Sequence, residues 1–184
     1  MASLTSPAMT AEAEPPAEPD VTLTSPAELL AGYLDFYRDA VLRKLDGLSD
    51  EELRGSRLPS GWAPLELLKH LAYVELRWLQ WGFAGQQVEQ PWGDMEARGG
   101  RWRVEAGETV EDVTAFFRAQ CERSRAIVAG ARLEDRMATL GGRVPPEEER
   151  PTLIWVLFHL LQEYARHVGH LDIARELADG ATGE

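Results

Sequence analysis

The 184-residue chain is poor in cysteine and in basic residues. Its one cysteine, Cys121, cannot form a disulfide within the chain, which excludes a disulfide framework and a cysteine-rich zinc module. Lys and Arg number 19 against 31 Asp and Glu, so the formal net charge is −12, which disfavours contact with a nucleic-acid backbone. We expect no nucleic-acid partner, and histidines and carboxylates are left as the candidate reactive groups.

The sequence also lacks the features of a membrane or secreted protein. No stretch approaches the roughly 18 uninterrupted apolar residues of a membrane-spanning helix. Residues 1–20 contain neither the basic segment nor the apolar segment of a secretory leader. We therefore expect a soluble, cytoplasmic protein with no membrane partner.

The chain divides into a tail and one domain. Residues 1–24 hold four prolines, four acidic residues and no aromatic or basic residue. Such a segment cannot bury enough apolar surface to offset its conformational entropy. The composition predicts a disordered, acidic and proline-rich tail over residues 1–24 and a folded domain over residues 25–184.

Apolar residues at three- and four-residue spacing predict four long helices in this domain. The predicted helices cover residues 26–48, 64–82, 109–130 and 151–180, with a short helical turn after Ser49. The connection 84–108 is longer than the roughly 12–15 residues of an ordinary loop, which is typical of a functional or disordered segment. No stretch shows the alternation of a strand. The sequence predicts an all-α four-helix bundle with a crossover connection.

The histidines lie on two of these helices. His159, Glu163, His167 and His170 fall at about 0°, 40°, 80° and 20° around the axis of the last helix, so they share one face. Glu163 and His167 are about 6 Å apart along that axis and can converge on one metal ion. His70 on the helix 64–82 would complete a site of two histidines and one carboxylate, which is typical of a catalytic zinc or a similar divalent ion.

The other polar residues of this region have several possible roles. His159 and His170 are about 16 Å apart along the helix, so they cannot both bind the same ion. His170 is a candidate proton carrier or partner of His167. His159 is an alternative ligand if Glu163 is instead a general base. Arg77, two helical turns from His70 on the same face, is the candidate partner for a substrate anion.

Tryptophans and arginines between residues 78 and 103 have two interpretations. They could form the wall and anion clamp of a substrate pocket, or they could pack the end of the bundle and meet solvent. Packing is the preferred interpretation for Trp78, and Cys121 is expected in the core. The residues concerned are Trp78, Trp81, Trp92, Trp102, Arg98, Arg101 and Arg103.

Two segments together resemble a known family. The first is the run His159, Glu163, His167, His170 and Asp172, and the second comprises Ser60-Gly61-Trp62, Leu68-Lys69-His70-Leu71 and Glu75. They resemble the DinB-like superfamily, within it an actinobacterial branch related to mycothiol-dependent maleylpyruvate isomerase and to mycothiol and bacillithiol S-transferases. The resemblance covers about residues 26–184.

The resemblance implies a crossover four-helix bundle, often dimeric, that holds a divalent metal with three ligands. These ligands fall on His70, Glu163 and His167, and Glu163 is similar to the residue that the isomerase has at that place. The resemblance further implies a metal-dependent enzyme, with Zn²⁺ ahead of Ni²⁺ or Fe²⁺, that activates mycothiol for transfer to, or isomerisation of, a small electrophile. His170, His159 and Arg77 are then the candidate catalytic residues, and a homodimer is expected.

Two other functions remain open at this stage. The first is a non-catalytic bundle that binds a small molecule or metal in stress or resistance. The second is a metal-assisted hydrolase that uses water in place of a thiol. Thiol dependence of turnover distinguishes the transferase from the hydrolase.

Overall fold

A computed structural model describes residues 17–96, 100–141 and 149–182. Its elements are α1 (Pro26–Leu45), α2 (Asp50–Arg54), α3 (Pro64–Glu75), the π-helix η1 (Leu76–Phe83), α4 (Val110–Ala129) and α5 (Leu153–Asp179). The described residues form no strand beyond two isolated bridges. The prediction of an all-α bundle is therefore confirmed. None of the described helices is long and apolar enough to cross a bilayer.

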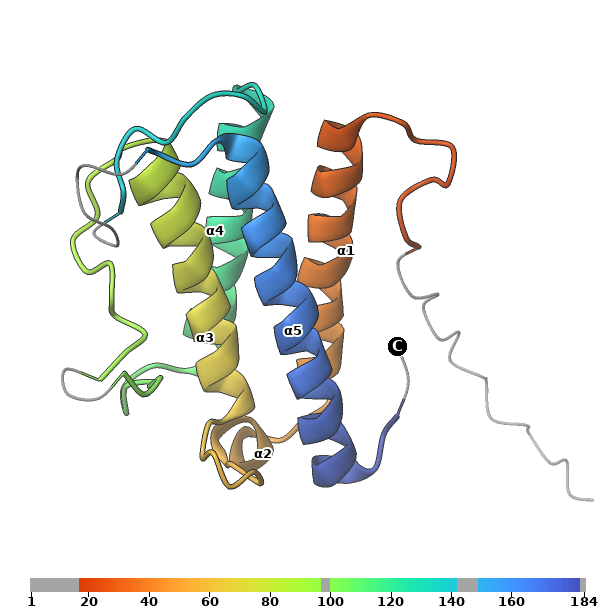
Figure 1. The fold of residues 1–184 in the computed structure, drawn as a ribbon. Coiled ribbons are helices and arrows are strands. Elements are labelled where there is room, and N and C mark those ends of the chain that lie inside the picture. The colour runs from red at the N-terminus through yellow and green to blue at the C-terminus, as the bar shows by residue number, and fades with distance from the viewer. Residues whose placement is uncertain (1–16, 97–99, 142–148, 183–184) are drawn as a thin grey trace, which may run out of the picture.

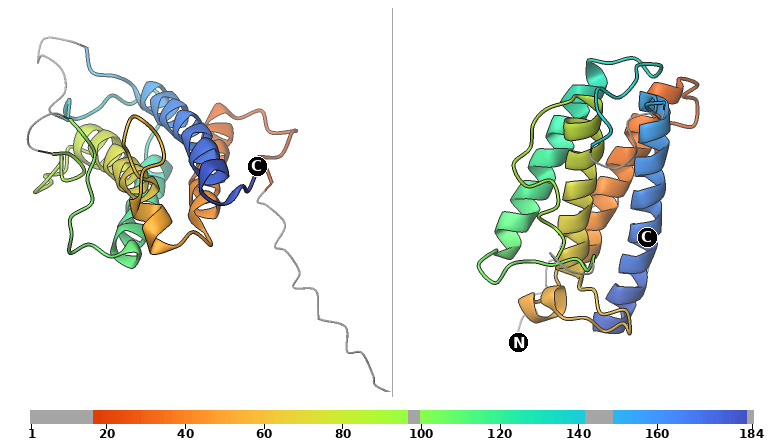
Figure 2. Two further views of the ribbon diagram at one scale, coloured as in Figure 1. Left: turned by 90° about the horizontal axis from the view of Figure 1, so that it is seen from below. Right: turned by 60° about the vertical axis from the view of Figure 1, so that its left-hand side comes forward.

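The four long helices pack as two pairs. α1 packs along α5, α3 packs along α4, and α3 also contacts α5. In Figure 1, α1 and α5 run downward while α3 and α4 run upward, so each pair is parallel. Parallel neighbours need a connection that returns along the whole bundle, and the segment between η1 and α4 provides it (Figure 2). The predicted crossover is thus observed.

The helix ends follow the capping signals in the sequence. Thr109 and Asp112 form a reciprocal capping box at the start of α4, which satisfies backbone N–H groups that have no partner within the helix. α1 ends at Leu45 rather than at Leu48, because Asp46 is extended with ψ 136° and Gly47 then takes a positive φ of 78°. Gly180 closes α5 in the left-handed conformation.

The predicted disordered tail is only partly within the described residues. Residues 1–16 lie outside them. Residues 17–24 include a turn in which Leu23 N–H donates to the Asp20 carbonyl. Pro19 lies against α1 so closely that a Cβ at Gly32 would come 2.8 Å from the Pro19 ring. This turn therefore packs against α1.

A change of helical register follows α3. In η1 the Ala84 N–H donates to the Leu79 carbonyl, five residues back, as in a π-helix. Gly82 lets this turn approach the segment that precedes α5, since a Cβ there would come 2.2 Å from Met137 Cε. The wide turn changes the directions in which the side chains of η1 project, relative to His70 on α3.

A polar cluster joins three helices inside the apolar core. The Arg38 Nε of α1 donates to Glu75 Oε1 of α3 at 2.9 Å, and the Tyr164 hydroxyl of α5 donates to the same oxygen at 2.8 Å. All three residues are buried. Burying these charges costs desolvation energy that their mutual contacts, together with the Arg38–Asp35 ion pair, offset, so the cluster fixes how α1, α3 and α5 meet.

We predict that Arg38→Met lowers the free energy of unfolding by about 3–5 kcal/mol, because it leaves the Glu75 carboxylate buried without its cation. Urea unfolding followed by circular dichroism measures the change. Arg118→Met, at an exposed position of α4, is the matched control and should change stability by no more than about 0.5 kcal/mol. An Arg38→Met variant as stable as this control would contradict the prediction.

Candidate metal centre

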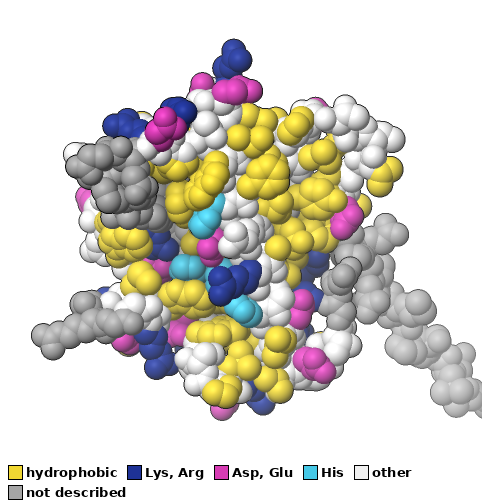
Figure 3. All heavy atoms as spheres, in the orientation of Figure 1, with side chains coloured by type: hydrophobic (Ala, Val, Ile, Leu, Met, Phe, Trp, Pro, Cys, Tyr) yellow, Lys and Arg dark blue, Asp and Glu magenta, His cyan; other side chains and the backbone are white. Residues whose placement is uncertain are grey.

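Three side chains from α3 and α5 converge on one point. His70, Glu163 and His167 each offer a ligand atom, and these atoms lie within 4.8 Å of one another. Glu163 Oε2 is 3.2 Å from His167 Nε2, close to the roughly 3.4 Å between two donors on a tetrahedral zinc ion with bonds of about 2.0–2.2 Å. The donor set and its spacing fit a divalent transition metal. Figure 3 shows histidine side chains gathered on one face of the bundle.

A buried carboxylate orients His70. The Nδ1 atom of His70 lies 3.0 Å from Asp94 Oδ2, so Nε2 is the ring nitrogen left for a metal. Metal-binding histidines commonly use their second nitrogen in this way. Asp94 is 0% exposed and comes from the long connection between η1 and α4, not from a helix.

Arg77 of η1 also pairs with Asp94. Its Nη1 and Nη2 donate to Asp94 Oδ1 at 2.6 Å and to Oδ2 at 3.0 Å, and its guanidinium lies 4.7 Å from the centroid of the Trp92 ring. Arg77 therefore lies on the side of His70, as its spacing suggested. Its buried guanidinium is engaged by a carboxylate of the chain itself rather than turned toward an incoming anion.

The same connection covers the ligands with an aromatic ring. Trp102 stacks on His70 with ring centroids 4.2 Å apart and meets His167 edge-on at 5.2 Å. Gly93 allows the connection to lie this close, because a Cβ there would come 2.2 Å from the Tyr73 hydroxyl oxygen. Trp102 and the residues around Gly93 thus form a wall of the site on the side of α3.

The remaining histidines of α5 flank the three ligand residues. His170 Nδ1 lies 3.3 Å from His167 Nδ1, and the Trp62 ring lies 6.0 Å from the His170 ring. On the other side, His159 Nε2 lies 3.6 Å from Glu163 Oε1. Each flanking histidine therefore contacts one α5 ligand, and neither contacts both.

Burial and local charge set the protonation of the site. Burial lowers the pKa of His70, which favours the neutral imidazole that binds metals. Burial alone would raise the pKa of Asp94, but hydrogen bonds from His70 and Arg77 outweigh it and hold that pKa below its usual value. The hydrogen bond from His167 lowers the pKa of Glu163. Burial, followed by the charges of His167 and Arg166, lowers the pKa of His170.

Of the tryptophans and arginines between residues 78 and 103, some lie at the candidate site and others make contacts away from it. Trp78 contacts His159, with ring centroids 4.4 Å apart, so it lies beside the site and does not only pack the bundle. Arg101 donates to the Gly61 carbonyl, and Arg103 pairs with a neighbouring glutamate. Arg98 lies outside the described residues.

Cys121 takes no part in this site. It is buried in the core, as expected, where burial raises its pKa to about 12. Its sulfur lies 3.9 Å from the Tyr164 hydroxyl oxygen. A thiol with so high a pKa stays protonated near neutral pH and is a poor nucleophile.

Comparison with known proteins identifies the class of this bundle. The chain matches the family described as mycothiol-S-transferase over residues 29–180. The match spans the whole bundle and all three converging residues, so the chain belongs to this family and, through it, to the DinB-like superfamily. No curated protein sequence matches the chain.

Sequence reasoning missed Asp94. It lies in a connection with no hydrophobic period, and its partners are 24 and 17 residues away along the chain. One signal was present, since an arginine two turns from His70 inside an apolar helix requires a buried anion somewhere in the fold.

We predict that Asp94→Ala lowers the free energy of unfolding by about 3–5 kcal/mol, because it leaves the Arg77 guanidinium buried and unpaired. Chemical denaturation measures the loss. The double variant Asp94→Ala/Arg77→Met should lose less than the sum of the single losses, because the two groups interact directly. Glu96→Ala, an exposed carboxylate of the same connection, is the control. Equal losses in Asp94→Ala and Glu96→Ala would refute the buried pair.

Proposed function

We propose that this chain is a metal-dependent transferase that joins mycothiol to a small electrophile. The observation that carries the proposal is the convergence of His70, Glu163 and His167 within 4.8 Å. The match to the mycothiol-S-transferase family supports the choice of thiol. Together they favour a site in which a bound cation and a thiol meet at one face of α3 and α5.

The donor set favours zinc as the cation. Two imidazole nitrogens and one carboxylate oxygen leave at least one position of a tetrahedral ion open, as in catalytic zinc sites. The same donors also suit Ni²⁺ and Fe²⁺. A divalent ion held there supplies Lewis acidity, which brings the pKa of a thiol toward neutrality.

The protein's own residues supply positioning and proton transfer. Asp94 and Arg77 hold the His70 ring in place, and we assign Arg77 this positioning role in preference to contact with a substrate anion. His170 and His159 are the candidate bases, since each lies beside one α5 ligand. One of them accepts the thiol proton, the sulfur forms a bond to the electrophilic carbon, and the leaving group departs with the bonding electrons.

The family resemblance also supports an isomerase variant of this chemistry, in which the thiol adds to the substrate and is later released. It further supports a homodimer and a cytoplasmic location. These belong to the proposal and do not alter the roles of the three ligand residues.

We predict that the purified chain, reconstituted with Zn²⁺, holds about one ion per chain, as a three-residue site requires. His70→Ala and His167→Ala should lose the ion while their helical circular dichroism persists, as elemental analysis of dialysed protein would show. His159→Ala is the matched control on the same face and should keep it. Zinc retained by His167→Ala would exclude the site. Zinc lost from His159→Ala but kept by Glu163→Ala would identify His159 as the third ligand.

We predict that the zinc-loaded protein consumes an alkylating electrophile only when mycothiol is present, because the thiol and not water is the nucleophile. Product formation is followed by mass spectrometry of the mycothiol adduct, with His167→Ala as the inactive control. Turnover at the same rate without thiol would indicate the hydrolase. Tight binding of the electrophile with no turnover at any thiol concentration would indicate a non-catalytic binding protein.

A further inference from the structure

Three rings form a cluster beside the metal centre. Trp78 of η1 lies 5.6 Å from Trp155 and 4.4 Å from His159, measured between ring centroids. His159 stacks on Trp155, with an interplanar angle of 5°. We call Trp78, Trp155 and His159 the aromatic cluster. It is continuous with the metal centre, because His159 Nε2 lies 3.6 Å from Glu163 Oε1.

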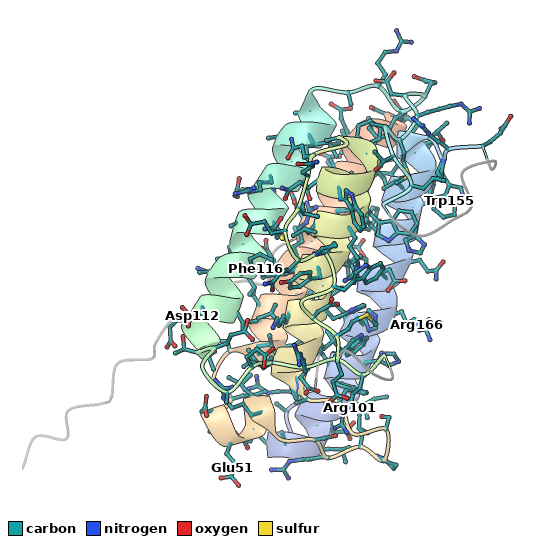
Figure 4. The ribbon with its side chains drawn as sticks, turned by 90° about the vertical axis from the view of Figure 1, so that its left-hand side faces the viewer. Glu51, Arg101, Asp112, Phe116, Trp155 and Arg166 are labelled. Atoms are coloured by element: carbon teal, nitrogen blue, oxygen red, sulfur yellow. The ribbon has the colours of Figure 1, made fainter. Side chains whose placement is uncertain are left out.

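The aromatic cluster presents apolar surface to solvent. Trp155 is 49% exposed, although it lies against two other rings. Figure 4 shows Trp155 and Arg166 projecting from the same side of α5 at different heights, and in Figure 3 hydrophobic side chains border the strip that holds the histidines. A half-exposed tryptophan next to a reactive centre provides area that a planar apolar ligand can bury.

After Glu163 the same face of α5 carries Arg166 and His170, and the Trp62 ring lies 6.0 Å from the His170 ring. Arg166 is exposed and directly precedes His167, and His170 Nδ1 lies 3.3 Å from His167 Nδ1. Along α5, Trp155 lies about 12 Å before Glu163 and His170 about 10 Å after it. On α5 the residues of the aromatic cluster therefore lie before Glu163, and Arg166 and His170 lie after it.

From this asymmetry we infer that the aromatic cluster binds the electrophile, as the planar apolar part of an aromatic compound, and that the thiol approaches from the end of Arg166 and His170. The inference rests on the proposed function. A sugar thiol rich in hydroxyl groups loses more hydration on an indole surface than an aromatic electrophile does. The less polar of the two substrates therefore belongs at the aromatic end, with its reactive carbon toward Glu163.

The test compares two electrophiles and two positions on α5. We expect Trp155→Ala to raise the KM for 1-chloro-2,4-dinitrobenzene about tenfold, or about 1.4 kcal/mol, because the variant loses the aromatic contact with the ring of the electrophile. The KM for mycothiol and the KM for iodoacetamide, which has no ring, should change less than about twofold, within ordinary surface effects. Trp155→Phe should restore most of the loss.

Phe158→Ala is the matched control. Phe158 is an aromatic residue on the same helix and is 57% exposed, but it lines an apolar pocket with Tyr33 and Tyr37 of α1. It should leave every KM unchanged. A rise in the KM for mycothiol in Trp155→Ala, or equal effects of Trp155→Ala and Phe158→Ala, would overturn the inference.

A binding measurement separates this inference from the proposed function. The unreactive analogue 2,4-dinitroaniline should quench tryptophan fluorescence of the His167→Ala protein, and Trp155→Ala in that background should weaken its binding while Phe158→Ala should not. Binding with this pattern but no turnover of the wild-type protein would refute the transferase and keep the aromatic site. Turnover by the wild-type protein with no contribution of Trp155 to binding would refute the aromatic site alone.

Discussion

The candidate metal centre depends on the contact of one carboxylate with two buried groups. Asp94 faces both His70 and Arg77 and has no exposed surface. Taking an arginine and an aspartate out of water costs several kcal/mol each, and only close, complete pairing offsets that cost. The connection that carries Asp94 must therefore fold against η1, and the orientation of the His70 ring follows from it.

The topology of the bundle explains why a connection residue is available at this place. Because α3 and α4 are parallel, the chain has to return from the end of η1 to the start of α4 along the full length of the bundle (Figure 1). Its path crosses the open side of α3, where His70 lies. The crossover thus brings Asp94 and Trp102 to a candidate site whose three converging residues all come from helices.

A second buried ion pair holds the helices that carry the ligands. Glu75 is the last residue of α3, and it joins Arg38 of α1 and Tyr164 of α5. Tyr164 directly follows the ligand Glu163 in sequence, so the anchor and the site share one turn of α5. The network fixes the rotation of α5 relative to α3, which is the quantity that decides whether Glu163 and His167 face His70.

The sequence predicted those parts of the molecule that repeat with the helical period. The four long helices and the shared face of His159, Glu163, His167 and His170 follow from spacing, because a helix converts residue number directly into direction. The partner of Arg77 and His70 could not be predicted. Asp94 lies in an irregular connection, where residue number does not determine the direction of a side chain, and tertiary folding brings it to the site. The π-turn of η1 was also hidden, because its apolar pattern fits an α-helix equally well.

The arrangement of these parts closes the metal centre on one side and leaves it open on the other. Trp102 stacks on His70 and Asp94 lies behind that ring, so the ligand contributed by α3 is covered by the connection. The side chain of Glu163 on α5 is 19% exposed, against 12% for His70 and 7% for His167. Access to the three converging residues is therefore greatest at Glu163, and the residues before and after it on α5 differ in polarity. A molecule that enters beside Glu163 meets the exposed residues of one helix, while the connection and the buried ion pairs keep His70, Glu163 and His167 in place.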